Sequence, residues 1–237
     1  MASLSQRAYD HIRGKLLRGG LLELSETKLV GELGISRTPI REAIRRLESE
    51  GLVDQVPRRG TYVRRPNRHD LEELYQIRLL LEPFAAGAAA ERINDQTVEQ
   101  LAAANEQMRD RFQHFDPQLQ EHWPQLIAEY AAADLQFHET LISATGNLRL
   151  LKIISDAQVL RQALGHPSDA PDEILTNLPE ANAEHEAIFN AVAGGDAPGA
   201  SAAMEQHIIR GRTRALKYFD WLERTSSEYL VDPRNGS

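Results

Sequence analysis

The stretch LGISRTPIREAIRRLESEGLV, Leu33–Val53, decides the fold of the first part of the chain. Its apolar residues recur at the spacing of one α-helical face: Ile40, Ala43, Ile44 and Leu47. Ser36 is a suitable N-cap before this pattern, and Gly51 is a suitable stop after it. The stretch therefore predicts an amphipathic helix over residues 36–50 whose apolar face packs on neighbouring helices.

Two helices are predicted before this stretch and a hairpin after it. Residues 5–18 carry one apolar face, and a second short helix starts near Ser25 and is stopped by Gly34. Residues 52–56 and 61–63 read as two short strands joined by a turn that contains proline and glycine. The order helix, helix, four-residue turn, helix, hairpin is typical of a winged helix-turn-helix.

Arginines follow the third helix outside its apolar face. Arg37, Arg41 and Arg45 recur every four residues, and a guanidinium can hold guanine O6 and N7 or pair with phosphate. Arg59 lies at the hairpin tip, where a wing can reach the minor groove, and Gly60 lets the backbone approach DNA closely. A run of charges alone is more often a solvated helix face. The stripe combined with the helix order and the wing indicates DNA binding.

The charge of the chain is unevenly divided. Residues 1–65 hold 13 Lys and Arg against 8 Asp and Glu, whereas residues 66–237 hold 14 against 27, so the net charge is −8. A basic head on an acidic body indicates that only the head meets a polyanion. Without cysteines, disulfides and thiolate metal sites are excluded. With neither a long apolar run nor a signal-peptide pattern, we expect a cytoplasmic protein without a membrane segment.

The stretch Leu33–Val53, together with PRRGTYV at Pro57–Val63, resembles the DNA-binding domain of the GntR family of bacterial regulators. The resemblance implies DNA contacts from the recognition helix and the wing, namely from Arg37, Thr38, Arg41, Arg45, Arg59 and Gly60. Many members of the family have an arginine at the start of the second helix, where Thr27 stands here. We therefore expect one DNA contact to be missing.

The rest of the chain predicts helices only, and the fold class is mostly α. The helices are expected at 70–92, 94–114, 121–145, 147–165, 172–194 and 196–224. Pro179 is expected to kink or split the fifth, and Asp196 to cap the sixth. The predicted domains are a winged helix-turn-helix head at 1–65, a linker at 66–69, an antiparallel all-α bundle at 70–224 and a polar tail at 225–237.

Four side chains in the body are candidate metal ligands. Asp134 and His138 lie four residues apart, so they share one face of a helix. His185 and His207 lie inside two later amphipathic patterns. A carboxylate and imidazoles can share one metal ion. A single histidine at a core edge is nevertheless more often hydrogen-bonded to its neighbours than bound to metal.

Three body segments resemble the metal-bearing motifs of the FCD sensor domain found in the FadR-type branch of the GntR family: Asp134–His138, Glu184–Ile188 and Met204–Ile208. The six predicted helices resemble the shorter, VanR-like form of that domain. The resemblance implies an Asp/His₃ site made of Asp134, His138, His185 and His207. This ligand set suits Zn²⁺ or Ni²⁺, and Mn²⁺ and Fe²⁺ stay open.

The resemblance also bears on Arg78, which occupies a position where the family pairs an effector carboxylate. The residues themselves offer an alternative, because Glu82 stands four positions later on the same predicted helix. A metal that accepts five or six ligands keeps open positions beside four protein ligands, and a small organic acid can fill them. The sequence leaves both interpretations of Arg78 open.

The function expected from these features is that of a transcription regulator, a repressor rather than an enzyme. As implied by the family, we expect a homodimer on a pseudo-palindromic duplex operator, controlled by a small organic acid. One alternative is a regulator whose metal is purely structural or is itself the signal. A more remote alternative is a metal-dependent hydrolase. It lacks support because no His-Glu-x-x-His motif and no paired carboxylates stand beside Asp134.

Overall fold

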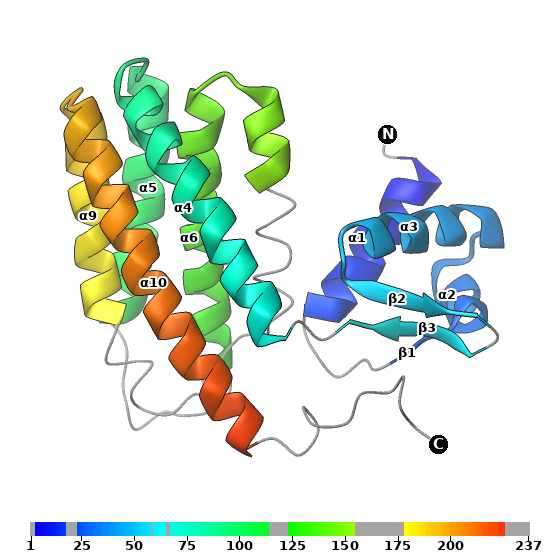
Figure 1. Ribbon diagram of the computed structural model, residues 1–237. Coiled ribbons are helices and arrows are strands. Elements are labelled where there is room, and N and C mark those ends of the chain that lie inside the picture. Colours follow the sequence, from blue (N-terminus) through cyan, green and yellow to red (C-terminus); the bar gives the residue numbers. More distant parts are fainter. Residues whose placement is uncertain are drawn as a thin grey trace. The chain divides into compact units, whose positions relative to one another are not determined.

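The computed structural model in Figure 1 describes residues 3–17, 23–57, 59–64, 67–113, 123–154 and 178–225. The chain forms two compact units. The head contains residues 1–67, and the body contains residues 68–154 and 178–221.

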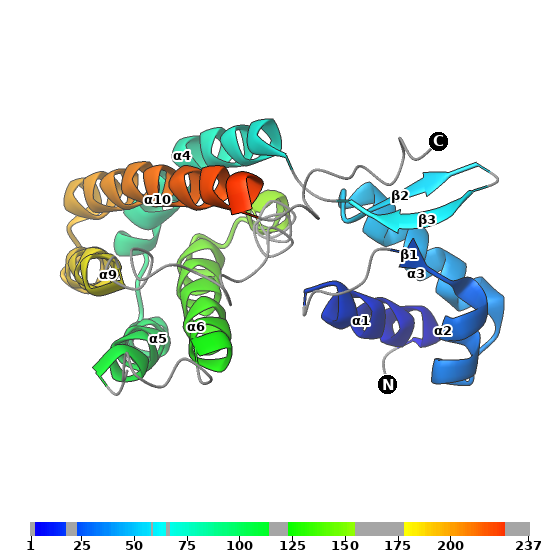
Figure 2. The same cartoon turned by 90° about the horizontal axis from the view of Figure 1, so that it is seen from below.

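The head is a winged helix-turn-helix, as predicted. Its helices are α1 (Leu4–Leu17), α2 (Glu26–Leu33) and α3 (Arg37–Ser49), and its strands are β1 (Glu23–Leu24), β2 (Val53–Val56) and β3 (Gly60–Val63). The strands pair antiparallel in the order β1-β3-β2. In Figures 1 and 2 the three helices gather on one side of this small sheet. The third strand, β1, was not predicted, because two residues are too few for an alternating pattern.

One apolar core holds the head together. The buried face of α3 consists of Ile40, Ala43, Ile44 and Leu47, as its spacing predicts. They join buried residues of α1, α2 and the strands in one cluster, which includes Ile12, Leu29 and Leu52. This packing fixes which side of α3 is turned away from the protein.

The turn between α2 and α3 follows its predicted end signals. Gly34 adopts the left-handed conformation at φ 64°, and its N–H donates to the carbonyl of Val30. The Ser25 hydroxyl accepts from the backbone N–H of Lys28 at 3.4 Å and so caps α2. Ser36 stands at the N-cap of α3, although its side chain makes no capping hydrogen bond.

The body is a helical bundle, as expected from the sequence. Its helices are α4 (Arg68–Ala90), α5 (Asp95–Gln113), α6 (Trp123–Ala144), α9 (Leu178–Ala193) and α10 (Ala197–Thr225), and residues 148–154 are also helical. In Figure 1 the helices α5, α6 and α9 run alongside one another, and α4 and α10 lie side by side and slant across them. Among the described residues, no helix is long and apolar enough to cross a membrane.

Two details of the body differ from the predicted boundaries. Helix α4 begins at Arg68, two residues early, so Arg68 and His69 lie in its first turn and not in a linker. Helix α9 begins at Leu178, so Pro179 lies in its first turn, where a proline ring is tolerated. The predicted end at 165, the predicted start at 172 and most of the tail lie outside the described residues. The Asp196 carboxylate accepts from Gly199 N–H at 3.0 Å and caps α10 as expected.

Candidate metal centre and DNA-binding surface

The four candidate ligands come together inside the body. Asp134 and His138 lie one turn apart on α6, His185 lies on α9 and His207 lies on α10. All four residues are buried, with exposed fractions between 0% and 7%. One ligand atom from each lies within 4.8 Å of the others. Three helices that are far apart in the sequence therefore meet at a single cluster.

The atoms that meet are the three Nε2 nitrogens and one carboxylate oxygen. His185 Nε2 lies 3.2 Å from Asp134 Oδ1, and His138 Nε2 lies 3.8 Å from the same oxygen. His207 Nε2 is 3.3 Å from His138 Nε2. His185 Nε2 is buried and makes no hydrogen bond within the described part of the chain. An unsatisfied buried nitrogen next to other ligand atoms fits a bound cation.

The opposite nitrogen of each imidazole faces an acceptor. His138 Nδ1 lies 2.8 Å from Glu82 Oε2, His185 Nδ1 lies 2.8 Å from the carbonyl of Ala181, and His207 Nδ1 lies 2.9 Å from Glu184 Oε2. Because these oxygens only accept, the Nδ1 atoms of His185 and His207 carry the proton, and their Nε2 atoms present lone pairs to the cluster. The contact of His138 Nδ1 with Glu82 has ion-pair distance but not hydrogen-bond geometry. Lone pairs and a carboxylate directed at one another repel, and a divalent cation between them removes that repulsion.

Burial keeps the imidazoles of His138 and His207 in the form that binds metal. Burial, assisted by the neighbouring His185, lowers the pKa of His207 to about 3, although Glu184 opposes the shift. Burial also lowers the pKa of His138, against the opposing effect of Glu82. Near neutral pH these side chains are therefore uncharged, and neutral imidazole is a good ligand for divalent transition metals.

Arg78 forms a buried ion pair with Glu82. Its Nε donates to Oε1 at 2.7 Å and its NH2 group donates to Oε2 at 3.2 Å, and the two side chains are only 3% and 1% exposed. Burial alone would raise the pKa of Glu82, but Arg78 and His138 outweigh it and hold that pKa well below its usual range. The pair with Glu82 is the second of the two interpretations left open by the sequence. Arg78 also supports His138, because Glu82 contacts His138 Nδ1. Its role toward an effector stays a prediction.

Glu184 supports His207 in the same way. Arg214 donates to both of its oxygens, at 2.9 Å to Oε1 and 2.7 Å to Oε2. Burial would raise the pKa of Glu184, but the hydrogen bonds from Arg214 and His207 lower it to about 2. Sequence reasoning missed the roles of Glu82, Glu184 and Arg214. The sequence contains one indication of the role of Glu184, its position next to His185. That indication is weak, because Glu186 also stands next to His185.

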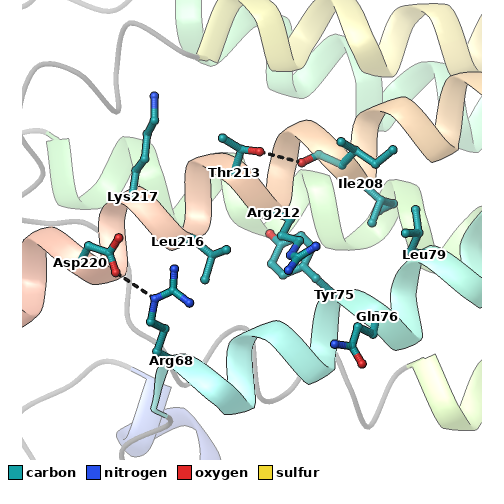
Figure 3. A pocket seen from close by; sticks show the side chains of 11 residues that line it. Arg68, Tyr75, Gln76, Leu79, Ile208, Arg212, Thr213, Leu216, Lys217 and Asp220 are labelled. Carbon is teal, nitrogen blue, oxygen red and sulfur yellow. Dashed lines mark hydrogen bonds and ion pairs between the residues drawn. The ribbon is translucent and has the colours of Figure 1, made fainter.

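A separate cavity of about 350 Å³ lies between α4 and α10 (Figure 3). None of the four cluster residues lines it. Arg68 at the start of α4 pairs with Asp220 of α10 at 3.2 Å across it. Tyr75 is in its lining, and the guanidinium carbon of Arg78 lies 5.1 Å from the centre of the Tyr75 ring. The cavity therefore adjoins Arg78, which pairs with Glu82 beside the histidine cluster.

The outer face of α3 carries the predicted DNA-reading side chains. Arg37, Thr38, Arg41 and Arg45 are all exposed, while the opposite face is the head core. Arg37 and Arg45 form no hydrogen bond or ion pair with another described residue. Cationic side chains of this kind can meet phosphates or base edges. The structure thus places these residues together on one surface of the head.

The wing is the β2–β3 hairpin. Arg59 and Gly60 are exposed at its turn, and Arg58 lies outside the described residues. Gly60 has a φ of 131°, a conformation that side-chain-bearing residues rarely adopt. A Cβ at this position would also lie 3.0 Å from Glu23 Oε1. The glycine is therefore required by the turn itself, whatever it does at DNA.

Known proteins share both units. The model of the bacterial regulatory proteins of the gntR family matches residues 4–63, and the model of the FCD domain matches residues 73–210. A probable D-xylose utilization operon transcriptional repressor from Paenarthrobacter nicotinovorans is 29% identical over 211 residues, which cover 87% of this chain and 86% of the relative. The gluconate operon transcriptional repressor of Bacillus licheniformis is 30% identical over 156 residues, which cover 64% of this chain and 59% of the relative.

Solved structures agree with the fold. E. coli McbR/YncC superposes with a TM-score of 0.74 at 22% identity and covers 92% of this chain and 98% of its own. A putative transcriptional regulator GntR from Rhodococcus sp. RHA1 superposes with a TM-score of 0.70 at 23% identity, covering 91% and 99%. The family models and the curated relatives place the protein among transcription regulators. The chain belongs to the GntR family of bacterial regulatory proteins and carries an FCD domain behind its winged head.

Proposed function

We propose that this protein is a homodimeric repressor that binds a pseudo-palindromic duplex operator through its two heads and is controlled by a small carboxylate in the body. The observation that carries the proposal is the exposed arginine stripe of α3, Arg37, Arg41 and Arg45, set on a core that turns it away from the protein. The wing residues Arg59 and Gly60 add a second contact. Two similar proteins are named as repressors, which supports repression over activation.

The proposed dimer contact is the outer face of α4. Ile77, Leu80 and Phe84 lie on one side of this helix and are 41%, 76% and 61% exposed. The helical segment 148–154, which packs against α4, adds exposed Leu148. An exposed apolar surface of this kind fits a second copy of the chain. Leu80→Glu with Phe84→Glu should yield a monomer in light scattering, and an unchanged dimer would place the contact elsewhere.

The metal centre would be held by Asp134, His138, His185 and His207. When bound, a divalent ion supplies a Lewis-acidic centre to which a carboxylate can coordinate. The chain's own part is to orient the imidazoles through Glu82, Glu184 and the Ala181 carbonyl. Two similar proteins are named for gluconate and L-lactate dehydrogenase operons. Hydroxy acids are therefore the first effector class to test, with Arg78 as a candidate partner.

A purely structural metal is the second candidate, and the burial of all four ligands favours it. His185→Ala separates the two roles. A large loss of thermal stability with unchanged effector affinity supports a structural ion. A loss of effector binding with a modest loss of stability supports a ligand-binding ion.

The whole proposal is tested by DNA binding. An operator is first selected from a random duplex library, and its affinity is then compared with that of random DNA at fixed salt, with and without hydroxy acids. A specific operator should bind at least about a thousandfold more tightly than random DNA. Equal affinity for both duplexes under every condition would overturn the regulator function.

A further inference from the structure

Among the three arginines of the α3 stripe, Arg37, Arg41 and Arg45, only Arg41 pairs with another residue in the described part of the chain. Its Nε donates to both carboxylate oxygens of Glu26, at 3.1 Å and 3.0 Å. Glu26 is the first residue of α2, directly after the capping Ser25. The Arg41 side chain remains 57% exposed and that of Glu26 is 33% exposed. The contact therefore joins the two helices of the helix-turn-helix at their outer surface.

The contact leaves the DNA-reading end of Arg41 available. A guanidinium has five N–H donors, of which the Nε–H is one. Its two terminal nitrogens keep four donors, and a bidentate contact with guanine O6 and N7 needs only two. Glu26 can therefore hold Arg41 while Arg41 holds a base. A side chain that is already restrained loses less conformational freedom on binding.

The charge of Glu26 acts on the rest of the duplex. A carboxylate near DNA is repelled by the phosphates, and this repulsion opposes binding of any sequence. At an operator, the repulsion is offset by the better-placed Arg41. At random DNA it is not offset, because no matching base is present. One side chain thus strengthens specific binding relative to non-specific binding.

We propose that Glu26 is a positioning residue that sets the operator selectivity of Arg41. The inference rests on the proposed DNA-binding function. Thr27, the next residue, has no charge with which to contact DNA at this edge of α2. Operator selectivity at this edge of α2 therefore depends on the Glu26–Arg41 pair.

The test compares Glu26→Ala, Glu26→Gln and a control, Glu32→Ala. Glu32 lies on the same helix and pairs with Lys15 and His11 of α1, so its removal also deletes one negative charge. We expect Glu26→Ala to weaken operator binding about fivefold, the upper range for an exposed ion pair, and to strengthen random-DNA binding. Glu26→Gln keeps an acceptor for Arg41 and should restore most of the operator affinity. Glu32→Ala should leave operator discrimination unchanged.

Two further measurements identify a positioning role. Operators changed at each base pair in turn should show that Glu26→Ala and Arg41→Ala relax discrimination at the same position. In an Arg41→Ala background, Glu26→Ala should change discrimination no further. The inference would be overturned if Glu26→Ala changed binding equally at all operator positions. It would also be overturned if Glu26→Ala changed discrimination as much in the Arg41→Ala protein as in the native protein. If the native protein does not discriminate between the operator and random DNA, the proposed DNA-binding function fails, and not only the role of Glu26. Thermal melting followed by circular dichroism shows whether each variant is folded.

Discussion

The buried pair of Arg78 and Glu82 leads to a quantitative prediction. Replacing Glu82 with leucine leaves a guanidinium that is 3% exposed without its carboxylate. Removing one partner of a buried ion pair typically costs about 3–5 kcal/mol. Removing both partners in favour of apolar side chains is often close to neutral. Glu82→Leu should therefore destabilise the body strongly, and Arg78→Met with Glu82→Leu should recover most of the loss.

The assay is thermal unfolding in chelator, so that metal ligation plays no part. Both tryptophans of the chain, Trp123 and Trp221, belong to the body, so their fluorescence reports its unfolding separately from that of the head. For a domain of this size, a loss of 3–5 kcal/mol lowers Tm by about 6–20 °C. The doubly substituted protein still lacks the acceptor for His138 Nδ1, so we expect it to remain slightly below the native Tm. Equal melting of the single and double variants would refute a buried, uncompensated Arg78.

Three other outcomes are expected. His185→Ala should abolish stabilisation by Zn²⁺ or Ni²⁺, which in the native protein should reach about 2.7 kcal/mol when the free metal concentration is a hundred times the Kd. Differential scanning calorimetry with and without the metal measures this stabilisation, and a variant that is still stabilised would place the ion elsewhere. Arg41→Ala should lower discrimination at one base pair of the operator by about 1–3 kcal/mol, measured by fluorescence anisotropy at constant salt. An equal loss of binding affinity for all sequences would mean that Arg41 contacts only phosphate. Leu47→Ala, at a fully buried position, should destabilise the head by about 2–5 kcal/mol and weaken operator binding. The unfolding of the body, followed by tryptophan fluorescence, should keep its native Tm, and a shifted Tm would mean that the two units do not unfold independently.

The sequence was most informative where the structure is local. The burial of Ile44 and Leu47 on α3 follows from helix periodicity, and the stop at Gly34 follows from its backbone freedom. The four cluster residues were found through a family resemblance, because spacing alone gives only the Asp134 and His138 pair. Nothing local indicates that His138 approaches His207, which is 69 residues away.

The supporting residues were harder to predict than the ligands. The chain has 35 acidic residues, and only packing decides that Glu82 and Glu184 turn inward toward imidazoles. The short strand β1 pairs with β3 through backbone groups, which any sequence provides. The ion pair between Glu26 and Arg41 joins two separate helices, so no periodicity reveals it.

The burial of the Asp134 and histidine cluster also has a kinetic consequence. Its side chains come from three packed helices and are almost wholly covered, so an ion can enter or leave only when the bundle opens locally. Exchange would then be as slow as that opening, and occupancy would be established largely while the body folds. If the cluster holds a metal ion, as we propose, it would keep that ion through brief changes in the free metal concentration. It is better suited to a resident cofactor than to following rapid changes in free metal concentration.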